Sequence, residues 1–497
     1  MALPDVSRLA TLSSEQWRAF AQRLIEIGLT NDAVLALTQV VDDVPHPVRA
    51  PLRQWHLRRA RTRAADALRL LTYGDELTEA EAADALTGPL LHALVDAGVL
   101  SLEAARCRSR FLLTFHGDLY VLVDDVLLHG GDAVMGSGRT TVHLSRASIP
   151  RVRAGRVLDF GCGAAPNALA LAAHADRVVA TDINPRAIVL AGVNAAINGI
   201  DNVELRVGDM FAPVAGERFD LVMSQPPFVA RPTGRDTATF LFGGARGDEF
   251  ALRLLAELPQ ILAPNGVAIL YVEWPELPGD PIESRIRAAQ PDAGVDVLVL
   301  RAPPVPLDVH AAAYAYVEHA RLDEAFDRTV VERREHLERM GFLAVSSTLT
   351  ILRRAPAGRD AWTHRIDVAA FEATTPNRAR IDRFMTTRDL LSTNDDARLL
   401  AARARLPKRT TIVEERSEPD PNTEPTFVLR FSERALLPPI GINREAFVLL
   451  SIVDAAPDVA SAAELIAREF QVSIDAARAK LLPHVREALD LGALEVV

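Results

Sequence analysis

The chain has little cysteine and no long apolar run. Cys107 and Cys162 are its two thiols in 497 residues, too few for the disulfide framework of a small secreted domain. It has no uninterrupted stretch of about 18 apolar residues, the length that a membrane-spanning helix needs. The residues after Met1 lack the basic and apolar stretches of a secretory signal. We therefore expect a cytoplasmic protein without disulfides, a membrane span or a metal cluster.

Lysine is scarce as well, since Lys408 and Lys480 are the two examples, and arginine supplies nearly all of the positive charge. The formal net charge of -11 disfavours a protein whose whole surface binds nucleic acid. A run of arginines between Arg49 and Arg69 could form a local polyanion site. A solvated helix face is the better interpretation of this run, because arginine is the usual cation throughout the chain.

The length suggests about three domains of 100 to 200 residues each. Helical periodicity predicts a helical N-terminal domain over residues 1–110. Residues 111–355 are expected to form an α/β domain with a lead-in hairpin at Phe111–Val123. A glycine-rich loop at Gly130–Gly138 follows the hairpin and could be either a lid over a ligand or a connector.

The last part of the chain, residues 356–497, begins with a proline-containing charged linker. A strand at Phe427–Phe431 and three amphipathic helices are expected after the linker. This order is similar to winged-helix folds and, more faintly, to small peptide-binding modules. The unit could therefore capture an extended peptide, pack on the rest of the chain or form a homodimer.

Between about residues 157 and 354, short apolar strands alternate with helical patterns. Val157–Phe160, Arg177–Thr181 and Val203–Val207 are expected strands, and helices are expected at Asn167–Ala173 and Pro185–Asn198. This βαβ order predicts an α/β fold with a doubly wound parallel sheet and helices on both faces. Ligands of such sheets bind beyond the carboxyl ends of the strands, so the residues after each strand are candidates for a site.

The first of these strands leads from Asp159 into a glycine turn, Gly161-Cys162-Gly163. A dinucleotide-binding turn requires a third glycine where the next helix packs and its N-terminus meets the pyrophosphate. Pro166 occupies that position and has no N–H to donate. The sequence therefore disfavours NAD or FAD.

Carboxylates after the next two strands favour a different adenosine-containing ligand. Asp182, 23 residues after Asp159, could bind ribose hydroxyls. Asp209 could accept from an adenine amino group, with Met210 packed on the ring. Either aspartate alone could be only a helix cap. Together with the glycine turn, at successive strand ends, they predict a site for S-adenosylmethionine.

The segments Val157–Asn167, Asp182–Asn184 and Gly208–Met210 resemble the successive cofactor motifs of class I S-adenosylmethionine-dependent methyltransferases. The resemblance extends over roughly residues 130 to 354. It implies a Rossmann-like methyltransferase sheet, methyltransferase activity and S-adenosylmethionine as the cofactor. The residues expected to hold the cofactor are Asp159, Phe160, Gly161, Cys162, Gly163, Asn167, Asp182, Ile183, Asn184, Gly208, Asp209 and Met210.

After a further strand at Leu221–Ser224, the sequence Gln225-Pro226-Pro227-Phe228 resembles the Asn-Pro-Pro-Tyr/Phe motif of methyltransferases that act on planar nitrogen. Release-factor glutamine methyltransferases and small-subunit ribosomal RNA guanine methyltransferases belong to this branch. The resemblance implies that a side-chain oxygen and a proline carbonyl accept N–H protons from the substrate while the aromatic ring stacks on its planar group. The predicted catalytic residues are therefore Gln225, Pro226, Pro227 and Phe228.

One position departs from the motif, because Gln225 stands where the branch has Asn. The additional methylene moves the acceptor oxygen by about one C–C bond, a displacement on the scale that lowers catalytic rate. A differently shaped substrate or a catalytically degenerate adenosylmethionine-binding protein would explain the change. In a purely structural interpretation, Pro226 and Pro227 only end the strand and Phe228 belongs to the core.

Further residues near these motifs are weaker candidates. Val134–Ser145, Arg235-Asp236 and Gly247–Glu249 resemble segments of a poorly characterised bacterial group of the same branch. Glu273 and Trp274, after a strand at Val267–Val272, could line the pocket. Candidates for a general base are His143, Asp236, Asp248, Glu249 and Glu273.

Several functions remain open at this point. The acidic balance and the likeness to peptide-binding modules favour N-methylation of a protein or peptide. Nucleic-acid base methylation through the Arg49–Arg69 run, and adenosylmethionine binding without turnover, are the alternatives. A small-molecule acceptor also fits the motifs.

Overall fold

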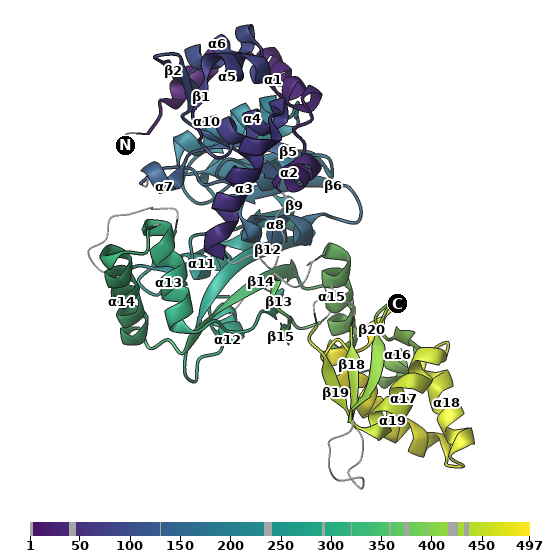
Figure 1. The fold of residues 1–497 in the computed structure, drawn as a ribbon. Helices are drawn as coiled ribbons and strands as arrows, with labels where there is room; N and C mark the ends of the chain where they lie inside the picture. Colours follow the sequence, from purple (N-terminus) through teal and green to yellow (C-terminus); the bar gives the residue numbers. More distant parts are fainter. Residues whose placement is uncertain are drawn as a thin grey trace.

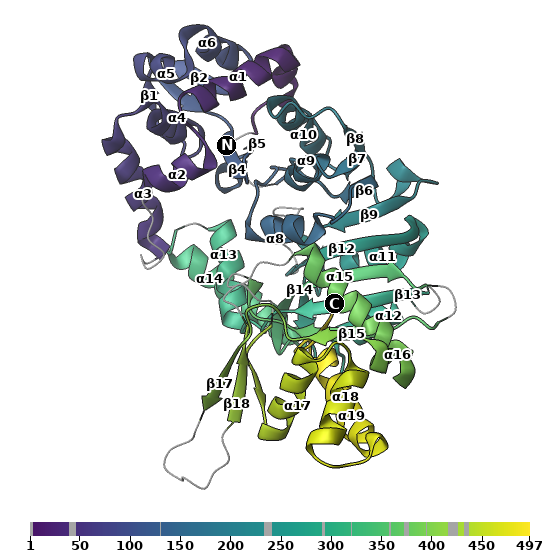
Figure 2. The same ribbon diagram turned by 90° about the vertical axis from the view of Figure 1, so that its right-hand side faces the viewer.

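The protein consists of three units that follow one another along the chain: mostly helical N-terminal residues, a central α/β unit and a smaller C-terminal unit (Figures 1 and 2). The first and last units lie at opposite ends of the molecule in Figure 1. The computed structural model describes residues 3–38, 46–129, 131–232, 241–290, 294–319, 321–356, 359–371, 377–393, 395–415, 426–431 and 437–497. Within these residues, no helix is long and apolar enough to cross a membrane.

The central unit is built on an eight-stranded mixed sheet. Its strands are β6 (Ala154–Phe160), β7 (Ala175–Asp182), β8 (Val203–Val207), β9 (Phe219–Ser224), β12 (Leu262–Glu276), β13 (Val295–Arg301), β14 (Ala344–Arg354) and β15 (Thr363–Asp367). Their order across the sheet is β15-β13-β14-β12-β9-β6-β7-β8. The chain runs from β6 outward to β8 and then returns to β9 on the other side of β6. Such a reversal leaves a crevice at the carboxyl ends of the two central strands.

The predicted Rossmann-like sheet is confirmed, with one difference in strand direction. β14 is antiparallel to both β12 and β13, whereas the sequence suggested a parallel sheet. The difference arises because α13 (Leu307–Glu318) and α14 (Glu324–Arg339) connect β13 to β14 and pack against each other. This helix pair returns the chain to the end of the sheet at which β13 finished, so β14 runs in the opposite direction.

Helices cover both faces of the sheet because alternate strand residues point to opposite faces. On β6, Val157 belongs to the core on one face and Leu158 to the core on the other. The first face carries α8 (Arg139–Ser148), α9 (Pro166–Ala172), α10 (Pro185–Ile197) and α15 (Arg378–Ser392). The second face carries α11 (Glu249–Glu257) and α12 (Ile282–Ala288).

The N-terminal residues pack on the far side of α10. Ala187, Leu190 and Val193 of that helix share one core with the N-terminal helices. The hairpin expected at Phe111–Val123 is present as β4 and β5 and is fixed to α10, since Asn194 Oδ1 accepts the backbone N–H of Leu122 at 2.7 Å. The elements of this part are η1 (Val6–Thr11), α1 (Ser14–Glu26), α2 (Asn31–Thr38), α3 (His46–Ala60), α4 (Arg63–Leu71), β1 (Leu77–Thr78), α5 (Glu79–Leu86), α6 (Gly88–Asp96), β2 (Leu100–Glu103), β3 (Arg106–Ser109), β4 (Leu112–His116), β5 (Leu119–Val123) and α7 (Val126–His129).

The sheet extends beyond residue 355, where the sequence placed the end of the α/β domain. β15 pairs in parallel with β13, and α15 then crosses the sheet face next to α8. A buried ion-pair cluster holds this extension, because Asp296 of β13 pairs with Arg353 and Arg359. Both arginines also contact Asp389 of α15. The chain therefore leaves the central unit later than its composition suggests.

The C-terminal unit has the expected strand and three helices, together with further short strands. The helices α17 (Arg444–Ala455), α18 (Val459–Glu469) and α19 (Ile474–Asp490) share one core. β17 (Thr411–Glu415), β18 (Thr426–Arg430) and β19 (Ile440–Ile442) form an antiparallel sheet beside them. The other elements are α16 (Asp396–Ala401), β16 (Ala404–Arg405) and β20 (Glu495–Val496).

Candidate active site

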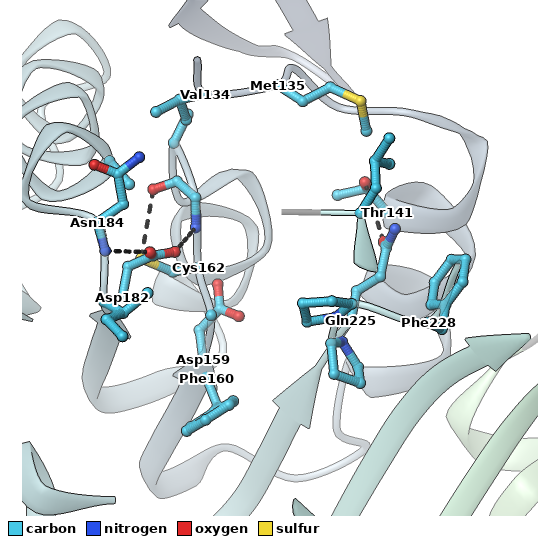
Figure 3. A pocket seen from close by; sticks show the side chains of 18 of the residues that line it. Val134, Met135, Thr141, Asp159, Phe160, Cys162, Asp182, Asn184, Gln225 and Phe228 are labelled. Carbon is cyan, nitrogen blue, oxygen red and sulfur yellow. Dashed lines mark hydrogen bonds between the residues drawn. The ribbon is translucent and has the colours of Figure 1, made fainter. Parts of the chain in front are cut away.

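A cavity of about 500 Å³ opens at the carboxyl ends of β6, β7 and β9, at the point where the strand order reverses. Every residue that the sequence predicted for the cofactor and for the acceptor lines this one cavity. Figure 3 shows Asp182 and Asn184 on one side of it and Gln225 and Phe228 on the other. The cavity therefore has two ends, which we call the cofactor end (Asp159–Asn167, Asp182–Asn184 and Gly208–Met210) and the acceptor end (Gln225–Phe228 and its neighbours).

The glycine turn at the cofactor end is fixed by backbone hydrogen bonds. The N–H groups of Gly161 and Cys162 donate to the carbonyl of Thr181 at 2.8 and 2.9 Å. Gly161 has φ +70° and Gly163 has φ +54°, conformations that glycine adopts without steric cost. Pro166 is the first residue of α9, where a missing N–H removes no helical hydrogen bond. Asp159 supports the start of that helix, since its Oδ2 accepts the Ala168 N–H at 2.9 Å.

Asp182 joins the loop after β7 to the glycine turn. Its Oδ1 accepts the backbone N–H of Asn184 and its Oδ2 that of Gly163, both at 2.8 Å (Figure 3). A carboxylate has about four acceptor positions, so two backbone donors leave capacity for ligand hydroxyls.

The next loop, at Gly208–Met210, contributes an apolar wall. Gly208 must be glycine, because a Cβ there would lie 2.4 Å from Cγ of Pro213. Met210 is buried, and the Phe160 and Phe250 ring centroids lie 6.5 Å apart. Phe250 also lines the cavity. These side chains offer the flat apolar surfaces that a purine ring requires.

The electrostatics of the cofactor end suit a cationic ligand. The pKa of Asp159 is raised to about 7, mainly by burial, with the Ala168 N–H opposing the rise and the nearby Asp182 carboxylate adding to it. Burial also raises the pKa of Asp182. In the described part of the chain, neither carboxylate has an ion-pair partner. A ligand with positive charge, as in the sulfonium and ammonium groups of S-adenosylmethionine, would favour their ionised forms.

The cofactor end also contains two buried polar side chains, those of Asn167 and Cys162. Asn167 Oδ1 is buried and has no hydrogen-bond partner among the described residues, so this oxygen is available to a ligand. Burial raises the pKa of the Cys162 thiol well above its ordinary value. Cys162 is therefore a neutral thiol that lines the cavity, not a nucleophile.

The acceptor end begins where β9 finishes. Ser224 donates its hydroxyl to the Phe160 carbonyl at 2.9 Å, which ties the end of β9 to β6. Thr141 of α8 donates its hydroxyl to Gln225 Oε1 at 3.4 Å (Figure 3). The Phe228 ring centroid lies 6.3 Å from that of Tyr271. Phe228 thus has both a cavity surface and a contact with the core.

The loop at Asp132–Gly136 covers the cofactor end and is held by side chains. The Val134 N–H donates to Asp124 Oδ2 at 2.8 Å, and Asn184 Nδ2 donates to the Asp132 carbonyl at 3.0 Å. Asp124 also forms a buried ion pair with Arg186 of α10. The described part of the glycine-rich loop therefore forms a wall of the cavity that is held by these contacts.

Sequence reasoning missed several lining residues that come from distant segments. These residues are Thr140, Thr141, Leu241, Phe242, Phe250, Tyr314 and Val317. Phe242 belongs to β11 (Phe242–Gly244), which pairs with β10 (Val229–Ala230) just after the acceptor motif. Thr141 lies inside Val134–Ser145, a segment that resembles the related bacterial group. No sequence pattern around Tyr314 indicates a site residue.

Four of the five general-base candidates, His143, Asp248, Glu249 and Glu273, lie outside the lining of the cavity. The expectation that Glu273 and Trp274 line the pocket is therefore wrong. Asp248 is buried in ion pairs with Arg246 and Arg285, and Glu249 accepts the Arg246 N–H at 2.9 Å. Glu273 lies behind Tyr314, and Trp274 is buried. His143 packs 5.9 Å from Phe371, measured between ring centroids. Arg235 and Asp236 lie outside the described residues.

Comparison with known proteins agrees with this geometry. Residues 140–266 match the methyltransferase small domain family. A release factor glutamine methyltransferase from Deinococcus radiodurans is 34% identical over 166 residues, which cover 31% of this chain and 59% of that protein. The resemblance to class I methyltransferases seen in the sequence is confirmed.

Two further relatives act on different macromolecules according to their names. A ribosomal protein uL3 glutamine methyltransferase from Bradyrhizobium diazoefficiens is 33% identical over 143 residues, 25% of this chain and 45% of that protein. A ribosomal RNA small subunit methyltransferase C from Alcanivorax borkumensis is 33% identical over 127 residues, 24% of this chain and 35% of that protein. The match spans less than two thirds of the length of each of the three relatives.

Proposed function

We propose that this chain, whose residues 140–266 form a methyltransferase small domain, transfers a methyl group from S-adenosylmethionine to a planar nitrogen of a protein or peptide. One observation carries the proposal: the cofactor motifs and the Gln225–Phe228 segment line the same cavity from opposite sides (Figure 3). A nucleoside held at one end would therefore face an acceptor held at the other.

At the cofactor end, each predicted residue has a distinct role. Asp182 binds the ribose hydroxyls with the acceptor capacity that its two backbone contacts leave. Asp209 accepts from the adenine amino group and Met210 packs on the ring. Asn167 and the turn at Gly161–Gly163 contact the amino-acid part. When bound, the cofactor would supply an electrophilic methyl group: its S–CH3 bond would break as the N–CH3 bond forms, and the nitrogen would release one proton to water. The protein would therefore contribute positioning more than acid–base chemistry.

At the acceptor end, the chain offers hydrogen-bond acceptors and a flat ring. Gln225 Oε1 and the backbone carbonyl of Pro226 accept two N–H protons, and the Phe228 ring packs on the planar group. A primary amide has two N–H donors in one plane. We therefore assign a glutamine side chain of a protein as the acceptor, the residue that appears in the names of the Deinococcus and Bradyrhizobium relatives.

Gln225 fits this role through its contact with α8. The Thr141 hydroxyl donates to its Oε1, and Thr141 is itself buried, so the longer side chain is restrained at its tip. A second lone pair on the oxygen stays available for the substrate. Thr141 is thus a positioning residue that offsets the extra methylene of Gln225.

The second candidate is methylation of a nucleic-acid base, which the ribosomal RNA relative favours. Pairing of the arginine run counts against it. Arg58 pairs with Asp75, Arg63 with Asp84 and Arg69 with Asp66, so the charge of these three arginines is offset. A protein acceptor is the better supported reading, with a catalytically degenerate binding protein as the remaining alternative.

The flanking units are proposed to present the substrate. Three helices with the β17–β18–β19 sheet support a winged-helix-like C-terminal domain, and the predominance of helices supports a helical domain at residues 1–110. The C-terminal unit lies away from the N-terminal helices (Figure 2), so each unit can contact a different part of a protein acceptor or of a second subunit.

The test is transfer of labelled methyl groups from S-adenosylmethionine to an extract of the cells of origin. We expect the label in protein, so that protease releases it and ribonuclease does not. Complete enzymatic digestion of the labelled protein should yield N-methylglutamine. The matched variant Gln225→Ala should lose the transfer while it still binds the cofactor. Label in RNA would support the second candidate, and cofactor binding without any transfer would support the degenerate protein.

A further inference from the structure

The helix pair α13 and α14 brings a tyrosine into the acceptor end. Because these helices connect the neighbouring antiparallel strands β13 and β14, they lie at the end of the sheet where the cavity opens (Figure 1). Tyr314 and Val317 of α13 line the cavity. Both lie beyond the segment 140–266 that matches the methyltransferase family.

Tyr314 is part of a polar cluster behind the cavity wall. Its hydroxyl donates to Glu273 Oε2 at 2.9 Å, and His310 Nε2 lies 3.2 Å from the same oxygen. His310 is one helical turn before Tyr314, and the two ring centroids are 4.8 Å apart. Glu273 lies near the end of β12 and its side chain is 17% exposed. The carboxylate therefore fixes the direction of the phenol O–H.

This arrangement leaves the phenol oxygen with an acceptor position that no described residue uses. Its single proton is directed at Glu273, and the described residues place no donor on the oxygen. A hydrogen bond to a carboxylate is charge-assisted and increases electron density on the donor oxygen. Burial raises the pKa of Tyr314 well above its ordinary value, and Glu273 adds to the shift. The phenol consequently remains neutral and does not act as a base.

The ring itself is held by α14. The Arg333 guanidinium carbon lies 6.0 Å from the Tyr314 ring centroid and 5.7 Å from that of Phe242, which also lines the cavity. Arg333 is buried and paired with Glu318 of α13. The position of Tyr314 is thus set before any substrate binds, which lowers the cost of using it for recognition.

We propose that Tyr314 determines acceptor specificity: its oxygen accepts an N–H from the methyl acceptor, and Glu273 and His310 orient it. This inference rests on the proposed function and names a further contact at the same site. The acceptor end then presents oxygen acceptors from Gln225, Pro226 and Tyr314 to the two N–H groups of a primary amide, so Tyr314 shares one of these donors with another acceptor. A primary amide satisfies them, whereas the carboxylate of the same shape has no N–H and meets the charge of Glu273.

The test compares two capped amino acids, N-acetylglutamine methylamide and N-acetylglutamate methylamide. Each is titrated into the full-length protein saturated with S-adenosylhomocysteine, and binding is followed by NMR. The wild type should prefer the amide. Tyr314→Phe should lower this preference about tenfold, the equivalent of one hydrogen bond of about 1.4 kcal/mol. Glu273→Gln, which keeps an acceptor for the phenol but removes the charge, should lower it about threefold.

The matched control is Tyr316→Phe on the same helix, because Tyr316 is 43% exposed and does not line the cavity. The preference of Tyr316→Phe for the amide probe over the carboxylate probe should equal that of the wild type. The inference is overturned if Tyr314→Phe weakens both probes equally, if it matches Tyr316→Phe, or if the wild type binds the probes equally or not at all.

The inference and the proposed function fail in different ways. If labelled methyl groups reach protein but Tyr314→Phe and Tyr316→Phe behave alike, the function stands and the inference is wrong. If the amide preference depends on Tyr314 but no methyl group is transferred, the recognition site stands and the function is wrong.

Discussion

The two ends of the cavity differ in how the chain builds them. The cofactor end comes from three consecutive strand-to-loop turns at Asp159–Met210, and backbone N–H groups hold its geometry. The acceptor end combines Thr141, Gln225–Phe228 and Tyr314, side chains that only the tertiary fold brings together. The first end lies wholly within the segment shared with the methyltransferase family, whereas the second extends beyond it. The cofactor end is thus built from local segments of the chain, whereas the acceptor end depends on the tertiary fold.

The largest expected effect lies at the cofactor end. Asp182→Ala removes the acceptor of two backbone N–H groups as well as the ribose contact, so affinity for S-adenosylmethionine should fall about 100-fold, or about 3 kcal/mol. Calorimetry measures this change. The control is Asp176→Ala on the same strand, whose side chain is 70% exposed and paired with Arg153. Equal affinities of the two variants would remove Asp182 from the site.

The next effect separates the two ends. Gln225→Ala should lower kcat about 30-fold through lost positioning of the acceptor, with cofactor affinity unchanged. Thr141→Val should lower kcat about tenfold, and Thr141→Ser, which keeps the hydroxyl, should restore it. Steady-state kinetics with labelled S-adenosylmethionine and the protein acceptor gives these kcat values. A parallel loss of cofactor affinity would show that the two ends are not independent.

A smaller effect is expected where the cofactor end meets the N-terminal residues. Asp124 accepts the Val134 N–H and pairs with Arg186, which also donates to the Pro4 carbonyl at 2.7 Å. Asp124→Asn should loosen the loop at Asp132–Gly136 and weaken cofactor binding about fivefold, or about 1 kcal/mol. Calorimetry beside a thermal unfolding curve distinguishes this from general destabilisation. Lower stability with unchanged affinity would show that the loop does not depend on Asp124.

Stability at the cofactor end should also depend on pH, an effect on unfolding and not on binding or rate. The pKa of Asp159 rises from its ordinary value of 3.8 to about 7 in the folded protein, so the folded state holds the proton more tightly than the unfolded state. The stabilisation is complete below about pH 3.8 and is lost as the pH rises to about 7.

Urea unfolding between pH 5 and pH 8 checks this linkage. The free energy of unfolding of the wild type should fall with rising pH relative to that of Asp159→Asn, and saturating S-adenosylmethionine should reduce the slope because a cation favours the ionised carboxylate. Parallel curves for the two proteins would contradict the buried, unpaired state of Asp159.

Local signals explain how much of the fold could be predicted. The sequence predicts the strands β6, β7 and β8 and the turn at Gly161–Gly163 because their signals are local. These signals are the spacing of apolar residues, the glycines and the missing N–H of Pro166, and each involves only a few neighbouring residues. The hairpin β4–β5 was visible for the same reason. Most residues that line the cofactor end could therefore be predicted from the sequence.

Long-range packing explains what could not be predicted. β14 is antiparallel because of where α13 and α14 return the chain. β15 lies beyond residue 355, the expected end of the α/β domain, yet pairs with β13. Thr141 contacts Gln225 across 84 positions of the chain. Tyr314 resembles any aromatic residue of an amphipathic helix, and its role emerges only from the nearby Glu273 and from the cavity.

The central claim is that the glycine turn after β6 forms the cofactor end of the cavity, and calorimetry of S-adenosylmethionine binding tests it most directly. Gly161 (φ +70°) lines the cavity, and no described heavy atom lies within 4 Å of a Cβ placed there, so Gly161→Arg would project into the ligand space. Gly216 has φ +79° and equal room but lies outside the lining, so Gly216→Arg carries the same backbone strain. S-adenosylmethionine should bind the wild type and Gly216→Arg but not Gly161→Arg. Undiminished binding to Gly161→Arg would show that this turn does not form the cofactor end.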